Sequence, residues 1–192
     1  MPGRVSIHTL SDLENWLQEN DISVAGWGEG YAKTIQRLFT EIQKGECHLQ
    51  NSPPLRVLPV VQLMVYQNGK ILVEKEQMLS DCRIRKRKML PSEKMKPNED
   101  WHSAALRCLE EELATPANQA VILTQVCKPV TRKRTSQSYP GLESLYFLYR
   151  VEMQLGSLPQ EDFWTSENSG REKEQAISRH LWGWMDPDEV KF

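Results

Sequence analysis

The N-terminal part of the chain places apolar residues at helical spacing. Residues 9–20 carry leucine and tryptophan on one face, and Ser11 and Glu14 have the spacing of a capping box. Residues 31–42 repeat large apolar side chains every three or four positions, and Gly45 follows as a helix stop. We therefore expect two short amphipathic helices at the start of the chain.

The pattern changes to strand character after two consecutive prolines, Pro53 and Pro54. Residues 55–67 are rich in β-branched and other apolar side chains, and residues 70–77 form a second such run. The pair Asn68-Gly69 between them is a strong signal for a tight hairpin turn. The sequence therefore predicts a β-hairpin here, with a domain boundary just before it.

The rest of the chain mixes strand and helix signals. The elements that we expect there are an irregular basic loop over 81–98, a helix over 101–113, strands over 120–126 and 142–153 separated by a polar loop over 131–141, and a last strand within 180–190 that enters a short helix capped by Asp186. The predicted fold class is α/β (α+β), with an N-terminal helical extension over 1–54 and one domain over 55–192. Two helices this small cannot bury their own apolar faces, so we expect them to pack on the same chain.

Composition places the chain among ordinary globular proteins. Its 192 residues are 39% hydrophobic and 26% charged, and the net charge of −2 argues against nucleic acid or a membrane surface as the main partner. No apolar run approaches the roughly 18 residues of a membrane span, and the first residues lack the layout of a signal peptide. We expect a cytoplasmic protein, with an organelle stroma or matrix and a homodimer left open. The four cysteines are widely spaced, which favours free thiols over a disulfide framework or a zinc site.

The helix expected over 101–113 carries the candidate chemistry. On a helical wheel centred on Leu109, Glu112 lies at the flank of the apolar face, next to Glu111, and Arg107 lies one turn earlier. Paired carboxylates of this kind suit Mg²⁺ or Mn²⁺, which accept phosphate oxygens and water at their remaining positions. The alternative is a solvated helix face on which Arg107 only forms a salt bridge with Glu111.

The segment MLPSEKMKPNEDWHSAALRCLEEELAT resembles the signature of the Nudix hydrolase superfamily, G-x5-E-x7-R-E-U-x-E-E-x-G-U, where U is aliphatic. The resemblance places Glu99, Arg107, Glu111 and Glu112 at the catalytic positions, with Glu111 and Glu112 as the metal ligands. It implies a Nudix-like α/β/α sandwich with a mixed sheet over residues 55–192. It also implies hydrolysis of a diphosphate linkage in a nucleoside-diphosphate-type or related small molecule, with Mg²⁺ or Mn²⁺ as cofactor.

The signature is degenerate at several positions. Ser92 and Glu93 stand where relatives have glycines, Ala114 replaces the final glycine, and Cys108 replaces the first glutamate of the R-E pair. A thiol beside carboxylates is a poor general base, because their charges raise its pKa. These departures leave a second hypothesis open, a catalytically silent Nudix-like module that senses a ligand or binds a protein.

A basic run precedes the signature. Five of the six residues from Arg83 to Lys88 are cations. On a strand, Arg83, Arg85 and Arg87 would share one face, so we predict that they bind substrate phosphates. The alternative is that this run is simply solvated.

Overall fold

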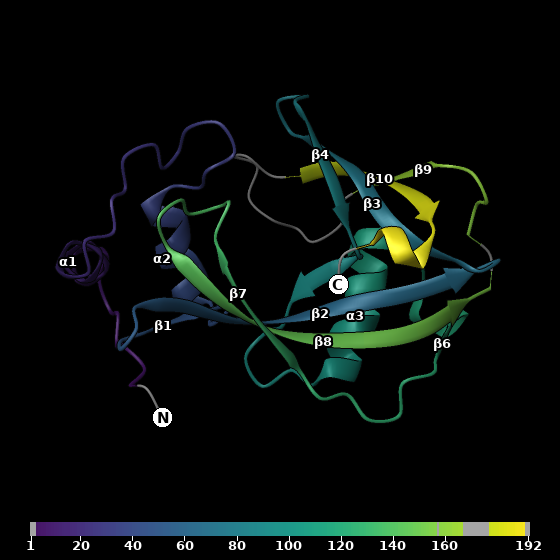
Figure 1. The fold of residues 1–192 in the computed structure, drawn as a ribbon, viewed down its shortest axis with the longest axis horizontal. Helices are drawn as coiled ribbons and strands as arrows, with labels where there is room; N and C mark the ends of the chain where they lie inside the picture. Colours follow the sequence, from purple (N-terminus) through teal and green to yellow (C-terminus); the bar gives the residue numbers. More distant parts are fainter. Residues whose placement is uncertain (1–2, 157, 167–176, 191–192) are drawn as a thin grey trace. The chain divides into compact units, whose positions relative to one another are not determined.

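The structure is a computed structural model that describes residues 3–156, 158–166 and 177–190 (Figure 1). The chain forms two compact units. The first unit comprises the chain up to Val60 together with residues 94–99 and 129–148, and the second comprises residues 61–93, 100–128 and the chain from Tyr149. The division predicted at residues 54 and 55 stays a prediction.

Helix α1 (Leu10–Glu19) of the first unit is capped differently from the prediction. The side chain of Thr9 accepts a hydrogen bond from the backbone N–H of Asp12, whose carboxylate accepts one from the N–H of Thr9. The capping box predicted at Ser11 and Glu14 is therefore wrong. Thr9 is the last residue with extended backbone, whereas Ser11 already lies inside the helix.

Helix α2 (Ile35–Gln43) begins later than the apolar pattern suggests. The side chain of Thr34 accepts a hydrogen bond from the N–H of Arg37, which fixes the start of the helix. Tyr31, the first residue of the predicted pattern, lies before the helix and is exposed. Gly45 has φ of 69° and its N–H donates to the carbonyl of Ile42, so the predicted glycine stop is confirmed.

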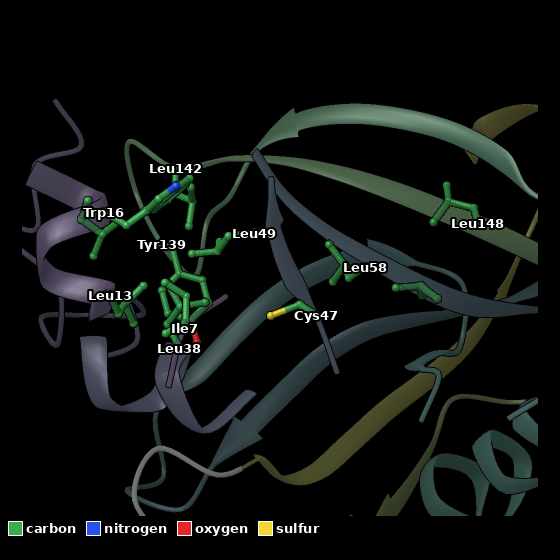
Figure 2. Close-up of a cluster of buried hydrophobic side chains, with 12 residues drawn as sticks. Ile7, Leu13, Trp16, Leu38, Cys47, Leu49, Leu58, Tyr139, Leu142 and Leu148 are labelled. Atoms are coloured by element: carbon green, nitrogen blue, oxygen red, sulfur yellow. The ribbon is translucent and has the colours of Figure 1, made fainter. Parts of the chain in front are cut away.

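The apolar faces of α1 and α2 are buried in a core that is formed within the first unit. Leu13, Trp16 and Leu38 belong to one cluster of buried side chains that also contains Tyr139 (Figure 2). The buried members of this core are Ile7, Leu13, Trp16, Leu17, Leu38, Cys47, Leu49, Leu58, Val60, Tyr139, Leu142 and Leu148. The N-terminal helices therefore pack on later segments of the same chain, as the sequence predicts.

Two strand pairs belong to the first unit. Strand β1 (His48–Gln50) pairs with the first residues of β2 (Leu55–Gln67), and β7 (Val130–Thr135) pairs antiparallel with the first residues of β8 (Glu143–Leu155). The predicted loop over 131–141 is therefore wrong in its first half. All six residues of β7 are exposed, so the sequence contains no alternation of apolar and polar residues that would predict a strand there. The strand is recognised only by its hydrogen bonding to β8.

The remaining strands are β3 (Lys70–Leu79), β4 (Ile84–Met89), β5 (Ser92–Lys94), β6 (Ala120–Ile122), β9 (Phe163–Ser166) and β10 (Ile177–Met185). The strand order is β6-β8-β2-β3-β10-β9, and β2 and β8 lie side by side in Figure 1. The hairpin of β2 and β3 is confirmed, and Asn68 and Gly69 both have positive φ at its turn. The basic run expected as a loop contains a strand that pairs with β3, so that prediction is wrong.

Helix α3 (Trp101–Leu113) has the predicted bounds. Asp100 caps its start, and Ala114 ends it in the left-handed conformation with φ of 50°. Short 3-10 helices follow at Ala117–Gln119 and at Pro187–Glu189. Asp186 stands at the N-cap of the second as predicted, but its side chain accepts no capping hydrogen bond, so the predicted side-chain cap is wrong. The α+β fold class is confirmed. Among the described residues, no helix combines the length and apolar character that a bilayer crossing requires.

Candidate metal centre

The buried face of α3 is rotated from the one predicted by the helical wheel. A wheel centred on Leu109 places His102 within the apolar stripe, but His102 is exposed, whereas Ala104, Cys108 and Glu112 lie in the buried face. Glu110, which the same wheel points away from the apolar stripe, is exposed. The buried residues of α3 centre about 50° from Leu109, on the side of Glu112, which is half the angle between successive residues. Glu112 therefore lies within the buried face and not at its flank.

Glu111 is held by an arginine on its own helix. Nη1 of Arg107 donates to Oε2 of Glu111 at 2.9 Å, and both side chains are largely buried. This is the salt bridge that the solvated-face alternative predicted. It also fixes the orientation of Glu111, which is the role that the resemblance implies for Arg107.

Glu112 meets two side chains from the sheet. Nδ1 of His180, on β10, lies 2.5 Å from Oε1 of Glu74, on β3, and 3.5 Å from Oε2 of Glu112. His180 is fully buried, and the two glutamates are 3% and 5% exposed. The facing donor atoms of the three side chains all lie within 4.8 Å of one another. We call Glu74, Glu112 and His180 the buried triad.

Neighbouring groups hold the buried triad in place. Nε of Arg87, on β4, lies 2.9 Å from the other carboxylate oxygen of Glu74. The hydroxyl of Thr165 donates to the backbone carbonyl of Glu112 at 2.5 Å and accepts a hydrogen bond from Nε1 of Trp182 at 2.7 Å. The ring of Trp182 stacks on that of His180 with the centroids 5.5 Å apart. Each member of the triad is thus fixed by packing or by a hydrogen bond.

Glu74 and His180 were not predicted as site residues. No short motif joins them, because they are far apart in the chain and meet only through strand pairing. A weaker signal was present in the sequence. Glu74 interrupts the apolar run of β3, and His180 alternates with Trp182 on the last strand. An ionisable residue on the inner face of a buried strand needs a partner, so such positions mark candidates.

The substituted signature positions are filled by buried side chains. Cys108 is fully buried, and burial together with the charges of Glu112 and Glu93 raises the pKa of its thiol well above the ordinary value. Burial and these two charges disfavour the thiolate form, which a general base at this position requires. Glu93, at a glycine position of the signature, is also buried, while Ser92 is half-buried.

The remaining predicted site residues have protein partners. Glu99 lies in the first unit, where its carboxylate accepts a hydrogen bond from the N–H of Lys96 at 2.7 Å. Nε of Arg83 contacts Asp81 at 2.7 Å, just before β4. Arg85 and Arg87 lie on the same face of β4, where Arg85 bonds to Gln77 and Arg87 to Glu74. The two strand arginines are therefore brought together, and the arginine before the strand is not part of β4.

The donor set of the buried triad fits a divalent cation. Two carboxylates and one imidazole are common ligands of divalent ions in proteins. Their facing atoms come from three separate elements, α3, β3 and β10, and lie close together. A salt bridge needs only two such groups, whereas a bound ion needs several. The exposed Glu110 of the same helix has no part in this group.

The structure is similar to several solved protein structures. A NUDIX hydrolase from Nitrosomonas europaea is 21% identical over 69% of this chain and 74% of that chain, with a TM-score of 0.37. The Ap4A hydrolase of C. elegans is 14% identical over 69% and 82%, with a TM-score of 0.40. A NUDIX-family hydrolase from Clostridium perfringens is 15% identical over 68% and 82%, with a TM-score of 0.40.

No protein-family model and no curated protein matches the sequence. The element order can still be compared with the one that the sequence resemblance implies. A β-hairpin over β2 and β3 is followed by α3, which carries the paired glutamates, and then by further strands and a short final helix. The described elements thus follow the order that the sequence resemblance implies.

Proposed function

We propose that the protein hydrolyses a diphosphate linkage in a nucleoside-diphosphate-type or related small molecule, with Mg²⁺ or Mn²⁺ as cofactor. The observation that carries the proposal is the place of Glu112. The resemblance assigns this residue to the metal, and its buried carboxylate faces two further ligand-type side chains, Glu74 and His180. A glutamate on a solvated face would have no such neighbours.

In this proposal some residues bind the cation and others orient its ligands. Glu112 and Glu111 hold the cation, and Arg107 keeps the carboxylate of Glu111 in one orientation through their 2.9 Å contact. Glu99 belongs to the proposed set through the sequence resemblance, which assigns it a supporting role toward the metal. A cation held there neutralises phosphate oxygens and lowers the pKa of a bound water.

The basic strand supplies the contacts to the substrate. Arg85 and Arg87 lie on one face of β4, with their guanidinium groups next to Gln77 and Glu74. Guanidinium groups bind phosphate oxygens through paired N–H donors. Arg83, which is more exposed beside Asp81, reaches a more distant phosphate. We assign no proton transfer to Cys108, because burial and the neighbouring glutamates disfavour its thiolate.

The proposal is tested by a hydrolysis screen on the purified full chain. A panel of nucleoside diphosphate sugars, dinucleoside polyphosphates and nucleoside triphosphates is incubated with Mn²⁺ or Mg²⁺, and the products are read by phosphorus NMR. We expect turnover of at least one class of compound, abolished by a chelator and restored by adding the metal back. If the folded protein cleaves nothing on the panel with either ion, the silent module that senses a ligand or binds a protein becomes the better account.

A further inference from the structure

We propose that the buried triad of Glu74, Glu112 and His180 is itself the ligand set of the ion, and that it selects Mn²⁺ or Zn²⁺ over Mg²⁺. This inference rests on the proposed function in that it concerns the same site. It goes further, because it replaces the expected pair of neighbouring glutamates by three residues from α3, β3 and β10. Glu111 remains with Arg107 in this arrangement.

The fold brings the two strand residues to one face. β10 pairs antiparallel with β3, and Trp182 lies directly opposite Glu74. Side chains two residues apart on a strand share a face, so His180 lies on the same face as Trp182 and Glu74. A shift of register between Leu181 and Trp182 moves His180 relative to β3 at this point.

The contacts of His180 favour an ion over a simple hydrogen bond. Its Nδ1 faces carboxylate oxygens of both Glu74 and Glu112, at 2.5 and 3.5 Å. One proton on this nitrogen can be donated well to only one of them. Ligands about 2.1 Å from one ion lie roughly 3 to 4 Å apart, so small side-chain rotations convert the triad into a coordination site.

Second contacts keep the ligands oriented. Oε1 of Glu74 faces His180, while its Oε2 is held by Arg87 at 2.9 Å. Ligating carboxylates are commonly fixed in this way by a neighbouring donor. Thr165 fixes the backbone of Glu112, and Trp182 covers the imidazole ring. The triad is therefore held before an ion arrives.

The imidazole determines which ion is preferred. Mg²⁺ favours oxygen ligands and keeps several bound waters. His180 offers a nitrogen ligand, and its full burial leaves little room for water around the ion. Imidazole nitrogen binds transition ions and Zn²⁺ more readily, and two carboxylates also suit Mn²⁺. The structure thus predicts that the nitrogen of His180 contributes to binding.

The first test measures nitrogen coordination directly. The full chain is loaded with Mn²⁺ after chelator treatment and studied by pulsed electron paramagnetic resonance, in which a coordinated imidazole produces nitrogen modulation of the spin echo. The same measurement is made on a variant with His8→Gln, His48→Gln and His102→Gln, which leaves His180 as the only histidine. We expect nitrogen modulation in both proteins. Its absence from the loaded proteins, or a failure to bind Mn²⁺ at all, would overturn the inference.

A calorimetric titration then compares the ions. We expect wild type to bind Mn²⁺ at least about tenfold more tightly than Mg²⁺, and His180→Gln to lose most of that preference. His102→Gln, at an exposed position of α3, is the matched control and should bind as wild type does. Equal affinities for the two ions would contradict the inference. If nitrogen modulation is observed but no hydrolysis, the proposed function is refuted and the triad as ligand set stands. If Mn²⁺ binds and hydrolysis occurs without nitrogen modulation, the triad as ligand set is refuted and the proposed function stands.

Discussion

Nδ1 of His180 lies 2.5 Å from Oε1 of Glu74, although 106 positions separate the two residues in the chain. The antiparallel pairing of β3 with β10 creates this contact, and Glu112 reaches it from α3. A helix that the signature already marked therefore places its last carboxylate against a histidine of the final strand. This relationship connects the fold to the proposed chemistry.

The first prediction concerns a buried carboxylate in the first unit. Glu41 is 3% exposed and lies within 2.8 Å of Lys33, Arg56 and Lys94. Removing its charge leaves cations close together in a buried setting, so Glu41→Gln should lower the free energy of unfolding by about 3 to 5 kcal/mol. Glu46→Gln, which removes only a partly exposed partner of Lys94, should cost under about 1 kcal/mol. Urea unfolding of the three proteins measures both values, and equal costs would contradict this account.

The same carboxylate predicts an acid limit to stability. Burial alone disfavours its charged form, but Lys33, Lys94 and Arg56 outweigh burial and hold the pKa of Glu41 well below the ordinary value of 4.5. The stabilisation is therefore present above pH 4.5, where the unfolded chain is also ionised, and is lost as the pH falls toward the folded-state pKa. Unfolding measured from pH 7 downward should show a shallower loss in Glu41→Gln. If the free energy of unfolding fell with pH in the same way in both proteins, Glu41 would not be a source of the pH dependence.

The structure also predicts the outcome of restoring the missing signature glutamate. Cys108 is fully buried next to Glu112 and Glu93. Cys108→Glu would add a larger, charged side chain there, so we expect a loss of stability on the order of 3 kcal/mol or more and no gain in hydrolysis. Cys108→Ala, which adds no charge, should cost less. Thermal melts and initial rates check this expectation, and a stable Cys108→Glu variant with faster turnover would refute it.

Removing the N-terminal helices should destabilise the chain. A shortened protein beginning at Ser52 lacks α1 and α2, which leaves the buried side chains of Tyr139 and Leu142 uncovered. We expect low solubility or a melting temperature several degrees lower. In the full chain, Leu38→Ala should cost about 2 to 5 kcal/mol, because Leu38 is fully buried. Tyr31→Ala, at an exposed position, should change stability by less than about 0.5 kcal/mol.

The elements predicted correctly from sequence are those with a strong local signal. The hairpin turn at Asn68 and Gly69 needs positive φ at both residues. Asn and Gly adopt positive φ readily, so this pair predicts the turn. The helix over 101–113 has clear periodicity and an aspartate cap at Asp100. Its buried face was misplaced by about 50° on the helical wheel, because Cys108 and Glu112, which the wheel did not include in the centre of the apolar stripe, are buried.

The elements that were missed depend on partners distant in sequence. β4 places cations at most of its positions, and the strand is defined only by pairing with β3. β7 is likewise exposed throughout and is defined by β8. The contribution of Glu74 and His180 to the candidate site follows from the register of β3 and β10, which no short sequence pattern encodes.

The most direct measurement of the central claim is the rate of metal-dependent diphosphate hydrolysis in two matched variants of α3. Glu112→Gln removes a buried carboxylate that faces His180, and Glu110→Gln makes the same chemical change at an exposed position of the same helix. With saturating Mn²⁺ and the best compound of the screen, Glu112→Gln should lower the initial rate at least about a hundredfold. Glu110→Gln should retain the wild-type rate, with both variants folded by circular dichroism. A folded Glu112→Gln protein that hydrolyses the compound as fast as wild type would contradict the account.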